Sequence, residues 1–202
     1  KNCPTIADAC FLGGLMALKT GRDAEAAQLL EKAVAQADSL GAMIEKYSLS
    51  AGVHIPITDE ITGYITADHD GALMALIEAY QQLGDARSAM KTAFELRKRN
   101  PDDVLVALSL VELYMEYESE KKESLKAVVN ITNNVENDSE IHGALLLYRA
   151  RALREMGMPD GARELLSKII RKKKDRSADL LRAIRYERAL AYEETGKKSR
   201  AR

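Results

Sequence analysis

The sequence contains little proline and cysteine and few large aromatic residues. Its 202 residues include only 4 Pro, 2 Phe, 2 Cys and no Trp. Because proline is scarce while alanine and leucine are frequent, the composition predicts helices joined by short turns. Cys3 and Cys10 are too few for a disulfide framework and lack the spacing of zinc ligands, so we expect a reducing compartment and no metal site.

Long apolar runs are also missing. No stretch approaches the roughly 20 apolar residues that a membrane-spanning helix needs, and no signal peptide is visible at the start. We therefore expect no membrane segment in this sequence and a cytoplasmic location. The sequence begins at Lys1 rather than at a methionine, and we expect the natural protein to be longer.

The sequence lacks the residue constellations that carry catalysis. His54, His69 and His142 lie far apart, and no glycine-rich loop is present that could cradle a phosphate. Asp68, His69 and Asp70 together suggest a metal site, but a carboxylate just before a helix is more often its N-cap, and we favour that interpretation. We predict that the protein is not an enzyme and uses no cofactor.

What the sequence does contain is a glycine followed five residues later by an alanine, four times over. Glycine adopts the positive φ that ends a helix, and a small alanine lets the next helix cross closely. Pro101 lies seventeen residues after Gly84, and it predicts the end of the helix that follows this glycine. The pairs are Gly21 with Ala26, Gly84 with Ala89, Gly157 with Ala162, and Gly196 with Ala201.

This pattern resembles the tetratricopeptide repeat, whose period is about 34 residues, and we expect a bacterial member of that family. Tyr80, Tyr114 and Tyr192 match its aromatic position in the first helix of a pair. The resemblance implies an all-α, right-handed α-solenoid of antiparallel helix pairs, a single domain over residues 1–202 whose last repeat is cut off at 202. The expected helices cover residues 5–20, 23–40, 70–83, 86–99, 102–117, 121–135, 139–156, 159–174 and 176–195, with another beginning at 198.

Residues 41–69 interrupt the repeats between the first and second helix pairs. The segments 53–57 and 61–65 are rich in β-branched residues and flank Thr58, Asp59 and Glu60. This arrangement predicts a small β-hairpin, with an irregular loop as the alternative. Pro56 restricts its strand to an edge, and an insertion of this length in a repeat array often has a function.

The resemblance also implies where a partner would bind, because the first helix of each pair lines the concave groove of such arrays. Leu15 and Leu18 share this face in the first pair, although some apolar positions could instead belong to the core. Glu78 and Glu112 would set specificity at one end, and arginines at the other. The predicted groove residues are Phe11, Met74, Glu78, Gln81, Glu112, Met115, Arg151, Arg154 and Tyr186.

Charge is divided unevenly along the sequence. Residues 143–202 carry a net charge of +9, whereas the remainder carries −10. The densest basic run, predicted as a basic patch, could be a solvated helix end, a dock for an acidic partner or nucleic acid, or one side of a head-to-tail contact. Few aromatic residues interleave with it, which disfavours base stacking. The run consists of Arg171, Lys172, Lys173, Lys174 and Arg176.

Taken together, these features predict a protein–protein interaction scaffold that holds a peptide or helical segment in its groove. The first alternative is an adaptor for nucleic acid or an acidic partner that acts through the basic C-terminal part. The second is a structural module that associates with itself as a homo-oligomer. The expected partner is a protein or peptide, with nucleic acid less favoured.

Overall fold

The computed structural model describes residues 4–41, 46, 52–58, 61–116, 121–136, 139–171 and 176–196. The chain divides into two compact units. The first unit runs to Ile57 and resumes over Thr62–Val106, and the second contains Thr58–Ile61 and the chain from Ala107 onward. Lys172, Lys173, Lys174, Ala201 and the expected start of a helix at 198 lie outside the described residues.

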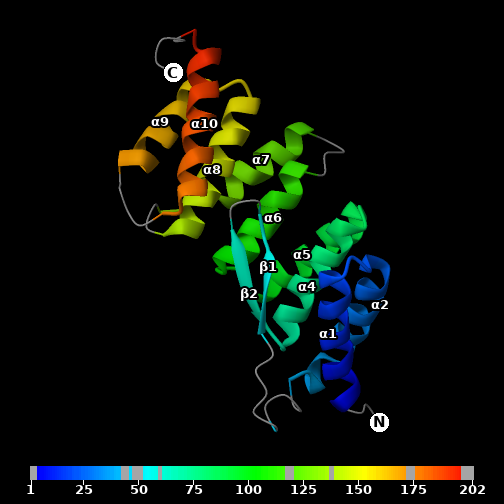
Figure 1. The fold of residues 1–202 in the computed structure, drawn as a ribbon. Helices are drawn as coiled ribbons and strands as arrows, with labels where there is room; N and C mark the ends of the chain where they lie inside the picture. Colours follow the sequence, from blue (N-terminus) through cyan, green and yellow to red (C-terminus); the bar gives the residue numbers. More distant parts are fainter. Residues whose placement is uncertain are drawn as a thin grey trace. The chain divides into compact units, whose positions relative to one another are not determined.

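The first unit consists of two antiparallel helix pairs and a hairpin (Figure 1). The two helices of each pair pack against each other, and the first helix of the second pair also packs on the second helix of the first pair. The elements are α1 (Pro4–Lys19), α2 (Asp23–Val34), the short 3-10 helix η1 (Ala37–Ser39), β1 (Gly52–Pro56), β2 (Thr62–Thr66), α4 (His69–Gln82) and α5 (Ala86–Arg99).

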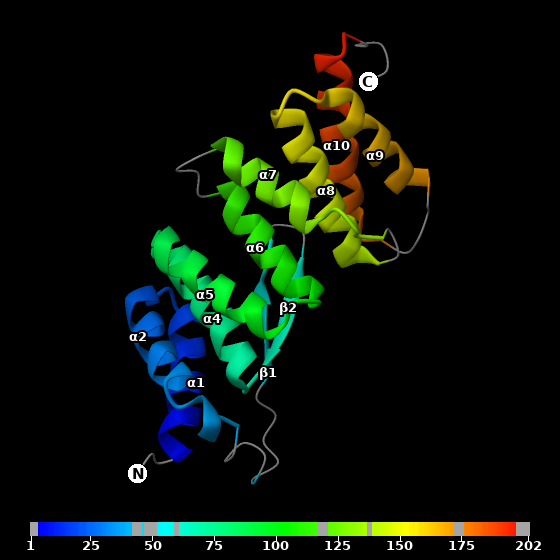
Figure 2. The same cartoon turned by 180° about the vertical axis from the view of Figure 1, so that it is seen from behind.

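The second unit continues the helical pattern (Figure 2). Helix α8 packs against α7, α9 and α10, and α9 packs against α10. The core of this unit contains fully buried leucines and isoleucines from α8, α9 and α10. The elements are α6 (Val104–Glu116), whose first turn belongs to the first unit, α7 (Lys121–Ile131), α8 (Glu140–Glu155), α9 (Pro159–Arg171) and α10 (Ala178–Glu194).

The four predicted turn glycines all adopt positive φ angles. The angles are 68°, 70°, 78° and 73° at Gly21, Gly84, Gly157 and Gly196. After α1, the Arg22 amide donates to the Ala17 carbonyl at 2.9 Å and the Gly21 amide donates to the Leu18 carbonyl at 3.1 Å. This pair of hydrogen bonds defines a Schellman motif. In it, a residue with positive φ directs two backbone amides toward carbonyls of the last helical turn. The same bonding recurs after α4 and α8.

The small residues predicted at the helix crossings are buried as expected. Ala26, Ala89 and Ala162 each have no exposed surface. Each lies in the first turn or two of the second helix of its pair. A larger side chain at such a position would push the two helices apart, because packed interiors leave no room for additional methyl groups.

The inserted segment forms the predicted hairpin. β1 and β2 pair antiparallel, with Val53 opposite Ile65 and Ile55 opposite Gly63. Ile55 and Ile65 are buried, whereas His54 and Tyr64 face each other on the other side, with ring centroids 5.0 Å apart. Alternation of this kind fixes the register, because a one-residue slip would expose the isoleucines.

The hairpin is anchored to the start of α4. Asp68 is the N-cap of this helix, and its Oδ1 accepts a hydrogen bond from the Gly71 amide at 2.7 Å. Asp70, in the first turn, accepts hydrogen bonds from Arg99 Nε at 2.7 Å and Asn100 Nδ2 at 2.8 Å. Burial raises the pKa of Asp70, but the bonds from Arg99 and Asn100 outweigh this and hold the pKa below its usual value.

Two helices, α2 and α7, end several residues before the sequence predicts. α2 ends at Val34 rather than at 40, since the chain turns back toward α1, where Asp8 Oδ1 accepts a hydrogen bond from the Gly41 amide at 2.5 Å. Gly41 has a φ of 87° at this turn. α7 ends at Ile131 rather than at 135, and Arg149 donates to the Thr132 and Asn133 carbonyls at 3.1 and 2.9 Å. A guanidinium can thus satisfy carbonyls beyond a helix end.

Candidate functional site

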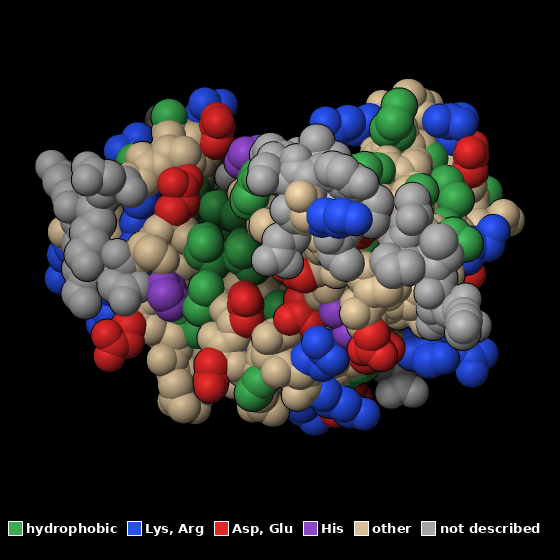
Figure 3. Space-filling view, turned by 90° about the horizontal axis from the view of Figure 1, so that it is seen from below, with side chains coloured by type: hydrophobic (Ala, Val, Ile, Leu, Met, Phe, Trp, Pro, Cys, Tyr) green, Lys and Arg blue, Asp and Glu red, His purple; other side chains and the backbone are tan. Residues whose placement is uncertain are grey.

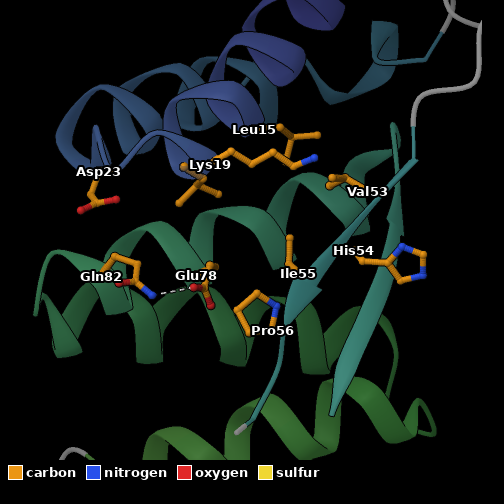
Figure 4. Close-up of a pocket in the computed structure, with 11 residues that line it drawn as sticks. Leu15, Lys19, Asp23, Val53, His54, Ile55, Pro56, Glu78 and Gln82 are labelled. Atoms are coloured by element: carbon orange, nitrogen blue, oxygen red, sulfur yellow. Dashed lines mark hydrogen bonds between the residues drawn. The ribbon is translucent and has the colours of Figure 1, made fainter. Parts of the chain in front are cut away.

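A cavity of about 310 Å³ lies in the first unit between α1, α4 and β1 (Figure 4). Two of these elements are first helices of their pairs, the helices that the repeat pattern assigns to the groove. The third, β1, comes from the insertion. The lining residues are Leu15, Leu18, Lys19, Gly21, Asp23, Val53, His54, Ile55, Pro56, Glu78 and Gln82.

The cavity combines apolar walls with a few charged groups. Leu15 and Ile55 are largely buried, with 7% and 6% of their surface exposed. Asp23 lies just after the α1–α2 turn and Glu78 on α4, and Lys19 extends from α1 toward β1 (Figure 4). Glu78 Oε1 accepts a hydrogen bond from Gln82 Nε2 at 2.8 Å. Gln82 lies one helical turn after Glu78, and this bond orients the Glu78 carboxylate. Such a mixture suits a peptide with both apolar and charged side chains.

The structure divides the predicted groove residues of the first unit. Glu78 lines the cavity, as do Leu15 and Leu18. Phe11 is fully buried, so it belongs to the core and its prediction as a partner contact is corrected. Phe11 lies on α1, which packs chiefly against α2, and a side chain covered in this way is not available to a partner. Met74 is 7% exposed and is not among the residues that line this cavity.

The hairpin's contribution was not predicted. Val53, His54, Ile55 and Pro56 form one side of the cavity, although the sequence placed only helical residues in the groove. The β-branched run indicates a strand but carries no information about which helices that strand covers. Gln82 and Lys19 were also missed, and each lies one helical turn from a groove position, Glu78 or Leu15. Asp23 was missed too, and it lies at the start of α2.

In the second unit, two predicted groove arginines belong to an internal ion-pair network. Glu187, on α10, is buried and forms a short ion pair with Arg154 Nε, and its Oε2 lies 3.7 Å from Arg151 Nε. Arg154 also reaches Glu194 at 2.8 Å, and the Arg151 guanidinium lies over the Tyr148 ring at 4.9 Å. The network therefore joins α8 to α10.

Electrostatics in this network favour the charged forms. Burial lowers the pKa of Arg154, but its bonds to Glu187 and Glu194 more than offset this and raise the pKa above the usual value. The side chains of Arg151 and Arg154 are only 25% and 19% exposed. Their guanidinium groups are thus used within the unit. Of the other predicted groove residues, Glu112, Met115 and Gln81 are half-buried and Tyr186 is 66% exposed.

Comparison with known proteins bears on this architecture. The family model described as a tetratricopeptide repeat matches residues 144–175, a stretch that covers most of α8 and all of α9. In this stretch the chain contains a tetratricopeptide repeat. No match was found among curated proteins.

Solved structures share the fold of this chain. MamA of strain AMB-1 is 16% identical, with a TM-score of 0.56 over 96% of this chain and 85% of that one. The thermophilic repeat protein TTC0263 of Thermus thermophilus is 18% identical, with a TM-score of 0.54 over 96% and 86%. Repeats of a protein described as a kinesin light chain from Podosopora anserina are 19% identical, with a TM-score of 0.61 over 100% and 92%. The predicted fold class, an α-solenoid of antiparallel helix pairs with one small hairpin, is confirmed.

Of the predicted basic patch, the structure describes Arg171 and Arg176. Arg176 is half-buried, and its guanidinium lies against Gly143, where a Cβ would overlap it. Burial lowers the pKa of Arg176, opposed by the charge of Glu140. Arg171 is exposed at the end of α9. On the face shown in Figure 3, acidic and basic side chains are interspersed.

A second cavity, of about 390 Å³, lies wholly within the second unit. Leu146 and Ile169 in its lining are buried, whereas Lys168 and Arg171 are exposed. Arg149, which also lines it, donates to the Thr132 and Asn133 carbonyls that follow α7. The lining residues are Val135, Leu146, Arg149, Leu165, Lys168, Ile169 and Arg171.

Among the described residues, no helix combines the length and the apolarity that crossing a bilayer requires. No three of their His, Cys, Asp and Glu side chains are grouped so as to hold a metal ion. Asp68 and Asp70 serve as the N-cap and first-turn partner of α4, which accounts for the acidic pair beside His69.

Proposed function

We propose that this protein is an interaction module that holds a peptide segment of a partner protein in the cavity between α1, α4 and β1. The tetratricopeptide repeat at residues 144–175, together with a fold shared with solved repeat proteins, supports a protein-interaction scaffold. The observation that carries the proposal is the cavity itself, because it lies on the first helices of two successive pairs and is closed on one side by the inserted strand. The apolar walls of the cavity would bury apolar side chains of the peptide. Lys19, Asp23 and Glu78 would favour peptides with complementary charges.

The test uses peptides recovered from a random ten-residue display library with the whole chain as bait. We expect Leu18→Glu to weaken binding of these peptides at least tenfold, a change of about 1.4 kcal/mol, since a carboxylate would enter an apolar wall. The matched control is Met16→Glu on the same helix, where the side chain is 65% exposed and outside the cavity. Binding is measured by fluorescence anisotropy, with circular dichroism to verify folding. Equal losses in both variants would contradict the proposal.

A second candidate function rests on the second cavity. We propose an acidic peptide as its partner, because its apolar lining residues and the cations Lys168 and Arg171 fit a segment that carries carboxylates beside apolar residues. We expect the double variant Lys168→Glu with Arg171→Glu to abolish binding of a labelled Glu-Leu repeat peptide. Arg182→Glu, on the exposed face of α10, should have little effect. Retained binding in the double variant, or equally strong binding of single-stranded RNA, would argue against it.

A further inference from the structure

The cavity in the first unit lies along the edge of a β-strand. Its lining includes four consecutive residues of β1, from Val53 to Pro56, and no residue of β2. Side chains of consecutive strand residues point alternately to opposite faces of a sheet. A cavity that touches all four therefore lies along the strand's edge, on the side away from β2.

That edge is unpaired in the described part of the chain. The sheet has two strands, and β1 pairs only with β2. The outer edge of such a strand presents N–H and C=O groups that can pair with another extended chain. Proteins commonly protect such an edge, and here Pro56, which lacks an N–H, stands at the last position of β1 and limits pairing to the residues before it.

The hairpin is held in a form suited to receive another strand. Ile55 and Ile65 are buried beneath it, and the His54 and Tyr64 rings contact each other across the two strands on the other face. Asp68 and Gly71 fix the point where β2 enters α4. The edge of β1 is thus presented by a braced element, and less conformational entropy is lost when a guest binds to it.

We propose that the partner binds in extended form and adds to β1 as a third strand, within the cavity walled by α1 and α4. The inference rests on the function proposed above and specifies the conformation and chemistry of the guest. Backbone hydrogen bonds to β1 would supply affinity, and alternate side chains would meet the apolar wall formed by Leu15, Leu18 and Ile55.

The charged residues that line the cavity restrict which peptides can bind. Asp23 and Glu78 bring two carboxylates to the cavity against the single ammonium of Lys19, which extends toward Val53 (Figure 4). A guest with a lysine or arginine beside Asp23 and Glu78 is therefore favoured. β1 has five residues, and at about 3.3 Å per residue it can pair with a guest of roughly the same number. The partner is an extended segment of about five residues with apolar side chains at alternate positions and one basic side chain.

The experiment leaves the protein unchanged and modifies the guest. The peptide is one that the parent chain selects from the library and that the Leu18→Glu variant binds less tightly. It is resynthesised as a series of peptides, each with a single N-methyl group on a different backbone amide. If the peptide is a third strand, N-methylation at every second position should weaken binding tenfold or more, because only alternate amides point toward β1. The intervening positions should tolerate it. Hydrogen exchange provides the matching readout, and alternate amides of residues 53–55 should gain protection when the peptide binds.

The outcomes separate this inference from the function on which it rests. Losses with a period of two, together with protected β1 amides, support strand addition. Binding that depends on Leu18 but shows no alternation would overturn strand addition and leave the cavity as a peptide site. Failure to recover any peptide that depends on Leu18 would overturn both. Replacing the guest's basic residue by glutamate should weaken binding at least tenfold, and unchanged binding would overturn the assigned preference for a cation.

Discussion

Replacing Glu187 by glutamine is expected to lower the free energy of unfolding by about 3 kcal/mol. Its carboxylate is 5% exposed and is the ion-pair partner of both Arg151 and Arg154. Glutamine keeps the shape but removes the charge, so two largely buried guanidinium groups lose their shared counter-ion. The quantity is measured by urea unfolding, followed by circular dichroism.

The chain supplies a graded set of controls for this substitution. Glu164→Gln removes a carboxylate that pairs with Lys168 at 3.2 Å, where both side chains are more than 60% exposed. Such surface pairs contribute less than about 0.5 kcal/mol, so this variant should unfold almost as the parent does. Glu194→Gln should lie between the two, since its side chain is 41% exposed. If all three variants lost similar amounts, burial would not explain the effect.

The second large effect is expected at Gly71, where alanine should destabilise the protein by about 2 kcal/mol. A Cβ built at this position overlaps the Thr66 carbonyl oxygen and approaches the Thr66 amide nitrogen. Both are backbone atoms at the end of β2, so the contact can be relieved only by moving the hairpin away from α4. Overpacking of this kind costs roughly 1–3 kcal/mol.

The sign of this effect runs against helix propensity, which favours alanine over glycine by about 1 kcal/mol. Gly161 is the matched control, because it lies early in α9 and a Cβ there would have no neighbour within 4 Å. Gly161→Ala should therefore stabilise the protein slightly, by up to about 1 kcal/mol. Urea unfolding of both variants decides the matter, and a stabilising Gly71→Ala would refute the close approach of β2 to α4.

The sequence was sufficient to predict the repeat framework because its determinants are local. A positive φ at Gly84 and a fully buried Ala89 follow from the needs of one turn and one helix crossing, and both are encoded within a few residues. The hairpin was predicted for the same reason. Its strands lie one residue outward of the expected ones, at Gly52–Pro56 and Thr62–Thr66, and such a shift is typical of pattern-based boundaries.

The candidate site was less predictable because it depends on contacts between distant residues. The register of the helices indicated Leu18 and Glu78, but nothing in residues 52–56 indicates that their strand lies against α1 and α4. Arg154 shows the converse error. Its position on a first helix suggested a groove contact, whereas the burial of Glu187, thirty-three residues further along the chain, assigns it to an internal ion pair. Phe11 was misassigned because periodicity alone does not distinguish a groove face from a core face.

The insertion lies between the first two helix pairs without disturbing their packing, since α4 contacts α2 directly. The packing of the two helix pairs is thus largely separate from the inserted hairpin. If β1 receives the guest as proposed, substitutions at its exposed residues would change which guests are accepted. Ile55 and Ile57 must stay apolar, because both side chains are buried. The same junction, from Gly41 to Asp68, is a natural place to graft a foreign hairpin when a new specificity is to be engineered.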